Sequence, residues 1–305
     1  MKKDKASGGI AANPKPSMDL EQLRESTLAA LRQEIQHQRQ SAALQRDERR
    51  RQGDEAFQLL QDCGVERQRL DRLEAQEQEQ LNRYLDGIRP GLVESPPRPR
   101  RAESDEAPHA ALLAELGPTL TPVKSDVLTQ LRSTSEAEFT TLSRRDLKAS
   151  MSGSGWGCWV EENPAYPDTM AYWWYSYTPS TTRSYNFWVS APYAGFYVIR
   201  ADDSWYNCKY AKSYAFYEVD VYQHYWRGAD RRTVIDRRDD NINQSGQVAG
   251  AIYWFFSQPL LANIPVTVRV TATLDVYAQG GGSYAELNFA DGADHYLDPP
   301  AVIIY

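Results

Sequence analysis

Aromatic side chains are the residues of this sequence whose number and spacing most clearly suggest a chemistry. All eight Trp and eighteen of the nineteen Tyr lie beyond residue 155. A flat ring with a polar N–H or O–H is suited to stacking on sugars and to protein interfaces. Runs such as residues 172–175 would place rings on both faces of one strand. We therefore expect exposed rings, and the candidate ligand-binding residues are Trp156, Trp159, Trp173, Trp174, Trp205 and Trp226.

Clustered acidic residues form a second group that could do chemistry. The sequence contains Asp202-Asp203 in one segment and Asp239-Asp240 in another. Carboxylate oxygens are the ligands that calcium prefers, although neither segment has the spacing of an EF-hand. Aspartates that alternate with arginines also pair with each other on a solvated loop. Calcium is thus the one cofactor that the sequence suggests, and a hydrolase would use Asp202 and Asp239.

No pattern of a nucleophile with its base, and no phosphate-binding glycine loop, occurs in the chain. The three cysteines, Cys63, Cys158 and Cys208, lack the spacing of a metal site. Cys158 and Cys208 could pair if oxidised, but in a reducing compartment we expect free thiols. The sequence therefore predicts a protein that binds or assembles rather than one that catalyses a reaction.

Charge and hydropathy exclude several partners. Residues 1–150 carry 24 basic and 25 acidic side chains, and residues 151–305 carry 10 and 16. Binding to nucleic acid requires a positive field, so we expect none. No stretch is long and apolar enough to span a membrane, and the first residues do not resemble a secretory signal. These features predict a cytoplasmic protein, with release by lysis or by a dedicated export machine as the alternative.

The elements that must position these residues change in type along the chain. Residues 1–17 are small, charged and proline-containing, as in a disordered tail. Residues 18–90 have the leucine spacing of polar helices, which Pro90-Gly91 should end. Residues 91–124 read as a proline-rich linker with a short helix. Residues 125–150 are predicted to form a last helix, with Val127, Leu131, Phe139 and Leu142 facing inward.

The helical region allows two arrangements. Leucines recur in a loose heptad, but Gln and Arg occupy many positions where a stable coiled coil has Leu or Ile. Residues 18–90 could form a parallel coiled coil that makes the chain multimeric. They could instead fold back on each other within one chain.

From residue 155 onward the hydrophobic period becomes two, which is typical of strands. In Val266–Val276 every second residue is apolar and the intervening ones are polar. The segments 185–190 and 196–201 should be strands joined by a turn at 191–195. The run YNFWVSAPYAGFYVIRA resembles the strand–turn–strand element of jelly rolls, such as carbohydrate-binding modules and tumour-necrosis-factor-like heads. We therefore expect residues 155–305 to form an all-β antiparallel sandwich, jelly-roll-like in path.

These elements predict an aromatic β-sandwich head presented on a helical region that multimerises or anchors it. Its partner would be another protein or a second copy of the chain. The alternative is a lectin-like module that binds glycans, with or without calcium. A membrane-active toxin component and a hydrolase are further alternatives.

Overall fold

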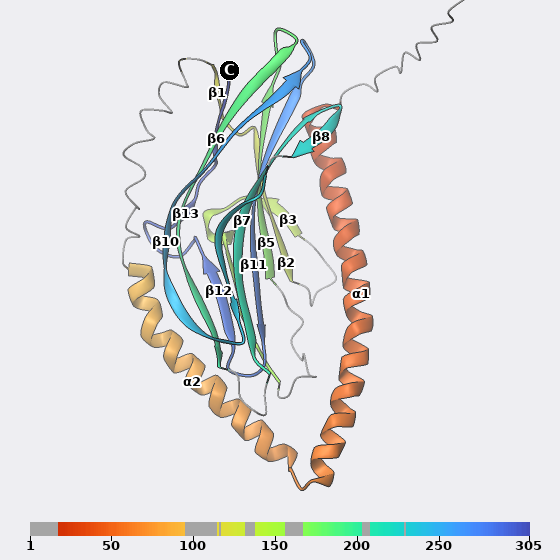
Figure 1. Ribbon diagram of the computed structural model, residues 1–305, viewed down its shortest axis with the longest axis vertical. Helices are drawn as coiled ribbons and strands as arrows, with labels where there is room; N and C mark the ends of the chain where they lie inside the picture. Colours follow the sequence, from red (N-terminus) through yellow and green to blue (C-terminus); the bar gives the residue numbers. More distant parts are fainter. Residues whose placement is uncertain are drawn as a thin grey trace, which may run out of the picture.

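The fold consists of two antiparallel β-sheets packed face to face, with one long helix on each outer side (Figure 1). It is seen in a computed structural model that describes residues 18–94, 115, 117–131, 138–155, 167–202, 208–228 and 230–305. The expected tail, residues 1–17, and most of the expected linker lie outside these ranges. The β-sandwich predicted from the period-two pattern is confirmed, and it begins well before residue 155.

The two helices are joined by a tight turn. Helix α1 spans Leu20–Asp62, and the side chain of Asp19 accepts a hydrogen bond from the backbone N–H of Gln22, which caps its first turn. Gly64 then takes a positive φ of 81°, which glycine adopts without steric cost. Helix α2 spans Arg67–Glu94. The polar region is therefore helical, and neither of these helices is long and apolar enough to cross a membrane.

The expectation that Pro90-Gly91 ends the helical region is wrong. Helix α2 continues through Pro90 to Glu94. Proline inside a helix removes one backbone hydrogen bond. The last turn is retained because Leu92 and Val93 pack against the sandwich, which offsets that loss.

Sheet A contains seven strands. The long strand β6 (Arg183–Asp202) pairs on one side with β10 (Asn241–Leu260) along its whole length. On its other side it pairs in turn with β14 (Ala301–Ile304), β13 (Tyr296–Leu297) and β12 (Tyr284–Asn288). Strands β1 (Thr119–Leu120) and β4 (Lys148–Ser152) extend the sheet beyond β14 and β12.

Sheet B also contains seven strands. Its order is β3 (Glu138–Thr141), β2 (Lys124–Leu131), β5 (Pro167–Tyr177), β11 (Val266–Gln279) and β7 (Tyr210–Gln223). Strands β8 (Tyr225–Gly228) and β9 (Arg232–Asp239) pair with the two ends of β7. A short 3₁₀ turn, Arg144–Asp146, links sheet B to β4 of sheet A.

The helix predicted over residues 125–150 does not exist. Strands β2, β3 and β4 occupy this part of the chain. Val127 and Leu128 are both fully buried, because β2 has its two faces covered, one by the core and the other by α1. Apolar residues on both faces of a strand imitate the spacing of a helix.

The turn predicted at 191–195 is also wrong, so the strand–turn–strand element expected there is one continuous strand. Residues 191–195 continue β6 without a break. Pro192 lies between the positions that pair with β14 and β13, so its missing N–H costs no ladder bond. Gly195 is needed for close packing, because a Cβ there would lie 2.4 Å from the carbonyl oxygen of Asn288.

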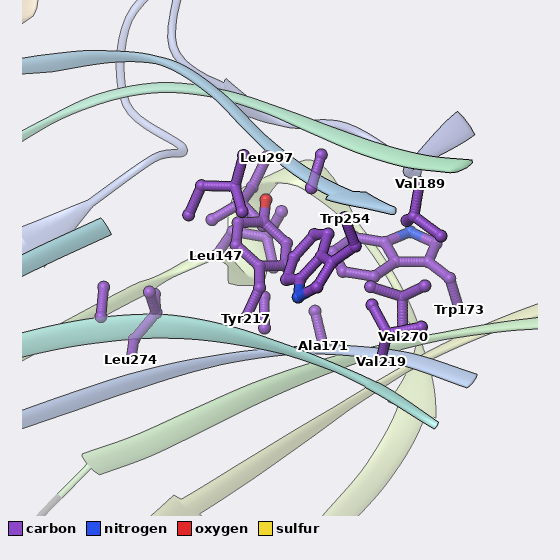
Figure 2. Close-up of a cluster of buried hydrophobic side chains, with 14 of the residues drawn as sticks. Leu147, Ala171, Trp173, Val189, Tyr217, Val219, Trp254, Val270, Leu274 and Leu297 are labelled. Carbon is purple, nitrogen blue, oxygen red and sulfur yellow. The ribbon is translucent and has the colours of Figure 1, made fainter. Parts of the chain in front are cut away.

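The core lies between the two sheets and is strongly aromatic (Figure 2). Tyr217 lies between two indoles: its ring centroid is 6.3 Å from that of Trp173 and 6.3 Å from that of Trp254. The alternate residues of β11 face this core as predicted, from Val266 to Val276. Burial raises the pKa of Tyr217 well above its usual value, so this phenol stays neutral inside the sandwich.

Helix α1 covers the outer face of sheet B through its first turns. Leu20 and Leu31 pack against a cluster that contains Trp174. Arg24 makes two hydrogen bonds of 2.7 Å to Asp126, whose carboxylate also accepts one of 3.2 Å from Trp174 Nε1. The hydrogen bond with Asp126 raises the pKa of Arg24. The helix is thus held by apolar contact and by a charged pair.

Helix α2 covers part of the outer face of sheet A. Leu81 and Leu85 pack on Phe196, Val198 and Tyr284. At one end of the contact Glu74 accepts a 2.7 Å hydrogen bond from the backbone N–H of Gly155. The two helices therefore contact opposite faces of the sandwich instead of folding back on each other. A coiled coil between chains stays a prediction.

Candidate functional site

Six of the ten residues predicted to bind ligand or metal can be placed. Trp156, Trp159, Trp205 and Asp203 lie outside the described residues. The remaining candidates are distributed over three places: the core, the surface under α1, and a corner between the sheets. The structure does not bring them together into one site.

Trp173 and Trp174 do not face solvent, so the prediction that these two rings are exposed is wrong. Both side chains have an exposed fraction of 0%. Trp173 belongs to the core between the sheets, whereas Trp174 lies beneath α1. The run of rings at 172–175 is explained by a strand with two covered faces, and it provides no ligand surface.

Trp226 is half-buried at the end of the α1 contact. The guanidinium of Arg269 lies 4.5 Å from its ring centroid, and the ring of Tyr222 lies 5.3 Å away. Arg269 is itself bound by Asp220, through a hydrogen bond of 2.6 Å. One face of this indole is thus covered by a paired cation, which leaves it poorly suited to stacking on a ligand.

The acidic residues Asp202, Asp239 and Asp240 are exposed and lie where the chain passes from sheet B to sheet A. Asp239 accepts hydrogen bonds from the backbone N–H groups of Asp240 and Asn241. The side chain of Asp240 and these two donors lower the pKa of Asp239. The carboxylate therefore caps a corner of the fold, and no group of three or more metal-binding side chains occurs in the described part of the chain.

A different group of rings does face outward. We call Trp188, Tyr253, Phe255 and Tyr305 the aromatic platform. Trp188 and Phe255 are direct cross-strand partners on β6 and β10, and Phe255 has an exposed fraction of 65%. The other three rings are half-buried. They lie on the outer face of sheet A, beyond the part that α2 covers.

The rings of the platform are arranged in two neighbouring pairs. The centroids of Trp188 and Tyr253 are 5.9 Å apart with the planes tilted by 38°. Those of Phe255 and Tyr305 are 6.3 Å apart with a tilt of 43°. Adjacent cross-strand positions on one face of a sheet are close enough to make such contacts. The result is a broad aromatic surface on a rigid sheet, not a deep pocket.

Polar groups surround the platform. Asn186 exchanges backbone hydrogen bonds of 2.8 and 3.0 Å with Tyr305, which fixes the C-terminal ring beside β6. The hydroxyl of Ser257 donates to the side-chain oxygen of Asn186. Ser184 and Ser257 are exposed on the same face. Rings bordered by hydroxyls and amides can stack on an apolar surface while hydrogen-bonding its polar edge.

The rings on the outer face of sheet B differ, because charged side chains cover them. The guanidinium of Arg231 lies 4.0 Å from the ring centroid of Phe216, and Lys212 lies 5.9 Å from that of Tyr214. Both cations are paired, Arg231 with Glu218 and Lys212 with Asp275. Among the described residues no cation lies over Trp188, Phe255 or Tyr305. Trp188, Phe255 and Tyr305 thus differ from Phe216 and Tyr214, over which paired cations lie.

The platform was missed in the sequence although a signal for it exists. On β6 Phe187 and Val189 face the core, so strict alternation sends Trp188 outward. On β10 Ile252 and Trp254 face the core in the same way. The alternation could have assigned each ring to a face, but it could not show which outward rings a helix covers.

The cysteines differ from the expectation of free thiols. Cys208 is disulfide-bonded, whereas Cys63 is free and exposed near the helical turn. Cys158 lies outside the described residues. The expectation is therefore wrong for Cys208.

Comparisons with known proteins give little further information. No protein-family description matches the chain, and no curated protein sequence matches it. Among solved structures, it is similar to TmCBM61 in complex with beta-1,4-galactotriose at a TM-score of 0.15 and 10% identity, covering 63% of this chain and 92% of that one. It is also similar to Eiger TNF from S. frugiperda at 0.13 and 11%, covering 59% and 100%. At these TM-scores the function has to be argued from the side chains of the chain itself.

Proposed function

We propose that this chain is a non-enzymatic binding module whose aromatic platform stacks on the flat faces of sugar rings. The supporting observation is the position of the platform: α2 covers one part of the outer face of sheet A and leaves Trp188 and Phe255 beyond its end. A folded sheet gains little stability from a phenylalanine that remains 65% exposed. An exposed ring cluster of this kind is typical of a binding surface.

The chemistry of the platform favours a sugar over a purely apolar partner. Tyr253 and Tyr305 each bring a phenol to the edge of the rings, and Asn186 and Ser257 add an amide and a hydroxyl. Sugar rings present C–H groups on their faces and hydroxyls at their rims, which matches this arrangement. Calcium is not needed in this proposal, because the aspartates at the sheet corner do not adjoin the platform.

Two further expectations from the sequence, the path of the chain and the role of the helical region, belong to the same proposal. A jelly-roll chain path and a helical region that multimerises the head would both suit a module that binds through several weak contacts. A protein partner is the second candidate, favoured by the apolar character of Phe255. A lipid surface is the third, because Trp and Tyr also lie at membrane interfaces.

A glycan array tests the proposal directly. The wild-type chain is expected to bind at least one class of glycan, and binding should persist in the presence of a chelator. Trp188→Ala and Phe255→Ala should each weaken it by at least about tenfold, since each loses the buried area of the ring and about 0.5–1.5 kcal/mol of stacking beyond it, and about 1.4 kcal/mol corresponds to tenfold in affinity.

Tyr225→Ala provides the matched control. Tyr225 is 59% exposed but lies outside the platform, with Arg227 stacked 4.4 Å from its centroid. Its loss should leave glycan binding unchanged. Absence of binding to every glycan, or equal loss in all three variants, would contradict the platform as a sugar site. Sedimentation of the chain with liposomes would then support the lipid alternative.

A further inference from the structure

The outer edge of sheet A is formed by an unusually long strand without charge. Strand β10 has 20 residues, and none of them is Asp, Glu, Lys or Arg. Among the described strands it pairs with β6 alone, and its register with β6 is unbroken from Asn241 to Leu260. Soluble proteins ordinarily protect such an edge with charges, bulges or short strands, because it can pair with another chain.

The direction of the backbone groups on β10 follows from the hydrogen bonds of β6. Asn186 exchanges both of its backbone hydrogen bonds with Tyr305, so its backbone N–H and C=O groups point away from β10. The direction of the backbone N–H and C=O groups alternates along an antiparallel strand. Those of Phe187 therefore point toward β10, where its partner is Phe256. The odd-numbered residues of β10 consequently direct their backbone N–H and C=O groups to the side of the strand away from β6.

The position of the proline supports this assignment. Pro259 is odd-numbered, so its missing N–H falls on the outer edge and interrupts no bond with β6. Proline occurs nowhere else in the strand. Over most of its length the edge therefore keeps the donors that a neighbouring strand would need.

The residues in the middle of the strand have small side chains as well as no charge. Ala249, Gly250 and Ala251 stand at its centre, and the N-terminal half adds Asn243 and Ser245, which are exposed. In an antiparallel pair with a second copy, each strand meets the same sequence in reverse. A charged strand would place like charges near each other in that arrangement, whereas β10 has none to repel.

We propose that two copies of this chain associate by antiparallel pairing of their β10 edges about a two-fold axis, which joins the two A sheets into one. A second copy is favoured over a strand of another protein because the edge lacks any charge that would select a different partner. The pairing adds a neighbour to a strand that pairs with β6 alone among the strands that the structure describes. It does not require the helices.

One consequence rests on the proposed function. A two-fold axis through antiparallel strands stands perpendicular to the sheet, so both aromatic platforms would face the same side. Two sites on one side can bind an extended polymer together, which raises the overall affinity without any new contact. The dimer itself does not depend on what the platform binds.

The mass of the full-length chain in solution, measured by light scattering after size exclusion, tests the proposal. The wild type is expected to be a dimer. Ala249→Pro and Ser245→Pro each remove one edge-directed N–H, and the ring obstructs the incoming strand, so each should raise the dimer dissociation constant at least about tenfold. The double variant should be monomeric.

Matched changes keep the test specific. Ser245→Ala at the same position retains the N–H and should leave the dimer intact. Ser184→Lys places a charge on the outer face of β6, away from the edge, and should also leave it intact. Leu59→Glu alters a leucine of α1 that is 69% exposed, and would affect only a dimer formed through the helices.

Several results would overturn the edge pairing. A monomeric wild type at all accessible concentrations would do so, as would a dimer that survives the double proline variant while thermal unfolding shows that variant to be folded. Loss of the dimer in Ser184→Lys or in Leu59→Glu, with the proline variants still dimeric, would assign the contact to the sheet face or to the helices. Glycan binding by a monomer would leave the proposed function standing and refute the dimer alone.

Discussion

The outer face of sheet A has two halves that carry similar residues but differ in their environment. In the covered half Phe196 and Val198 lie beneath α2, and Phe196 has an exposed fraction of 1%. In the open half Trp188 and Phe255 lie beyond the helix, and Phe255 is 65% exposed. Phe196 and Trp188 occupy even-numbered positions of the same strand, so alternation places both on the same face. Whether a ring on this face is buried or exposed therefore depends on how far the helix extends over the sheet.

This difference shows how α2 divides one sheet into a structural part and a binding part. Leu92 and Val93 are the last residues of α2 that pack on the sheet. Near this end the side chain of Gln247 on β10 donates to the carbonyl oxygen of Leu92, at 3.4 Å. Beyond this point no helix in the described part of the chain lies above the rings. The comparison can be tested by making the same change in both halves.

The largest contrast is expected from two phenylalanines. Phe196→Ala should lower the free energy of unfolding by about 3–5 kcal/mol, because it removes a buried ring and leaves a cavity beneath α2. Phe255→Ala should change it by less than about 0.5 kcal/mol, because that ring is already solvated. Urea denaturation of both variants measures the difference. Equal effects would mean that the two halves are packed alike.

A smaller effect is expected from the buried carboxylate of the covered half. Glu286 accepts hydrogen bonds of 2.9 Å from Arg89, 2.7 Å from Tyr284 and 3.1 Å from Asn288. Glu286→Ala should cost about 2–3 kcal/mol, since it leaves buried donors unpaired.

Glu286→Gln keeps an acceptor of the same length and should cost clearly less than Glu286→Ala. Ser257→Ala, in the solvated open half, should cost less than about 0.5 kcal/mol. The ranking of the three variants by urea denaturation is the measurement. If Glu286→Ala were as mild as Ser257→Ala, the hydrogen-bond network under α2 would contribute nothing to stability.

The smallest expected effect concerns pH. Burial opposes ionisation of Asp291, but hydrogen bonds from Asn288 and Lys148 outweigh it and lower the pKa of this carboxyl. A lowered pKa in the folded state adds stability above the unfolded value of about 3.9, and that stability is lost as the pH falls through the folded pKa. Because the ion pair with Lys148 is partly solvated, the effect should stay below about 1 kcal/mol.

Asp291→Asn should remove this part of the acid dependence and leave stability above pH 5 slightly lower. The free energy of unfolding of both proteins, measured from pH 2 to pH 6, shows whether the two curves converge in acid. Curves that stay parallel throughout would contradict the role of Asp291. The platform should keep its ligand affinity in this variant, because Asp291 belongs to the loop beside the covered half.

Local patterns in the sequence were sufficient for the helices and for several strands. The leucine spacing of residues 18–90 predicted helical structure, and the alternation in β11 predicted which of its residues face the core. These features depend on side chains three, four or two positions apart on one element, and such periods can be read without knowing the partner element. In β11 the second face is buried too, but it carries Thr267, Thr271 and Thr273, so the apolar residues still keep a period of two.

The tertiary structure alone decided the rest. The sequence predicts a helix over residues 125–150 because β2 has both faces covered, and two overlapping sets of apolar residues hide the period of two. The same double burial makes the prediction of Trp173 and Trp174 as exposed rings wrong. Whether a ring is core or platform depends on which distant segment lies over it, as α1 lies over Trp174 and no described helix lies over Trp188. Such contacts join residues far apart in the chain, and no local period encodes them.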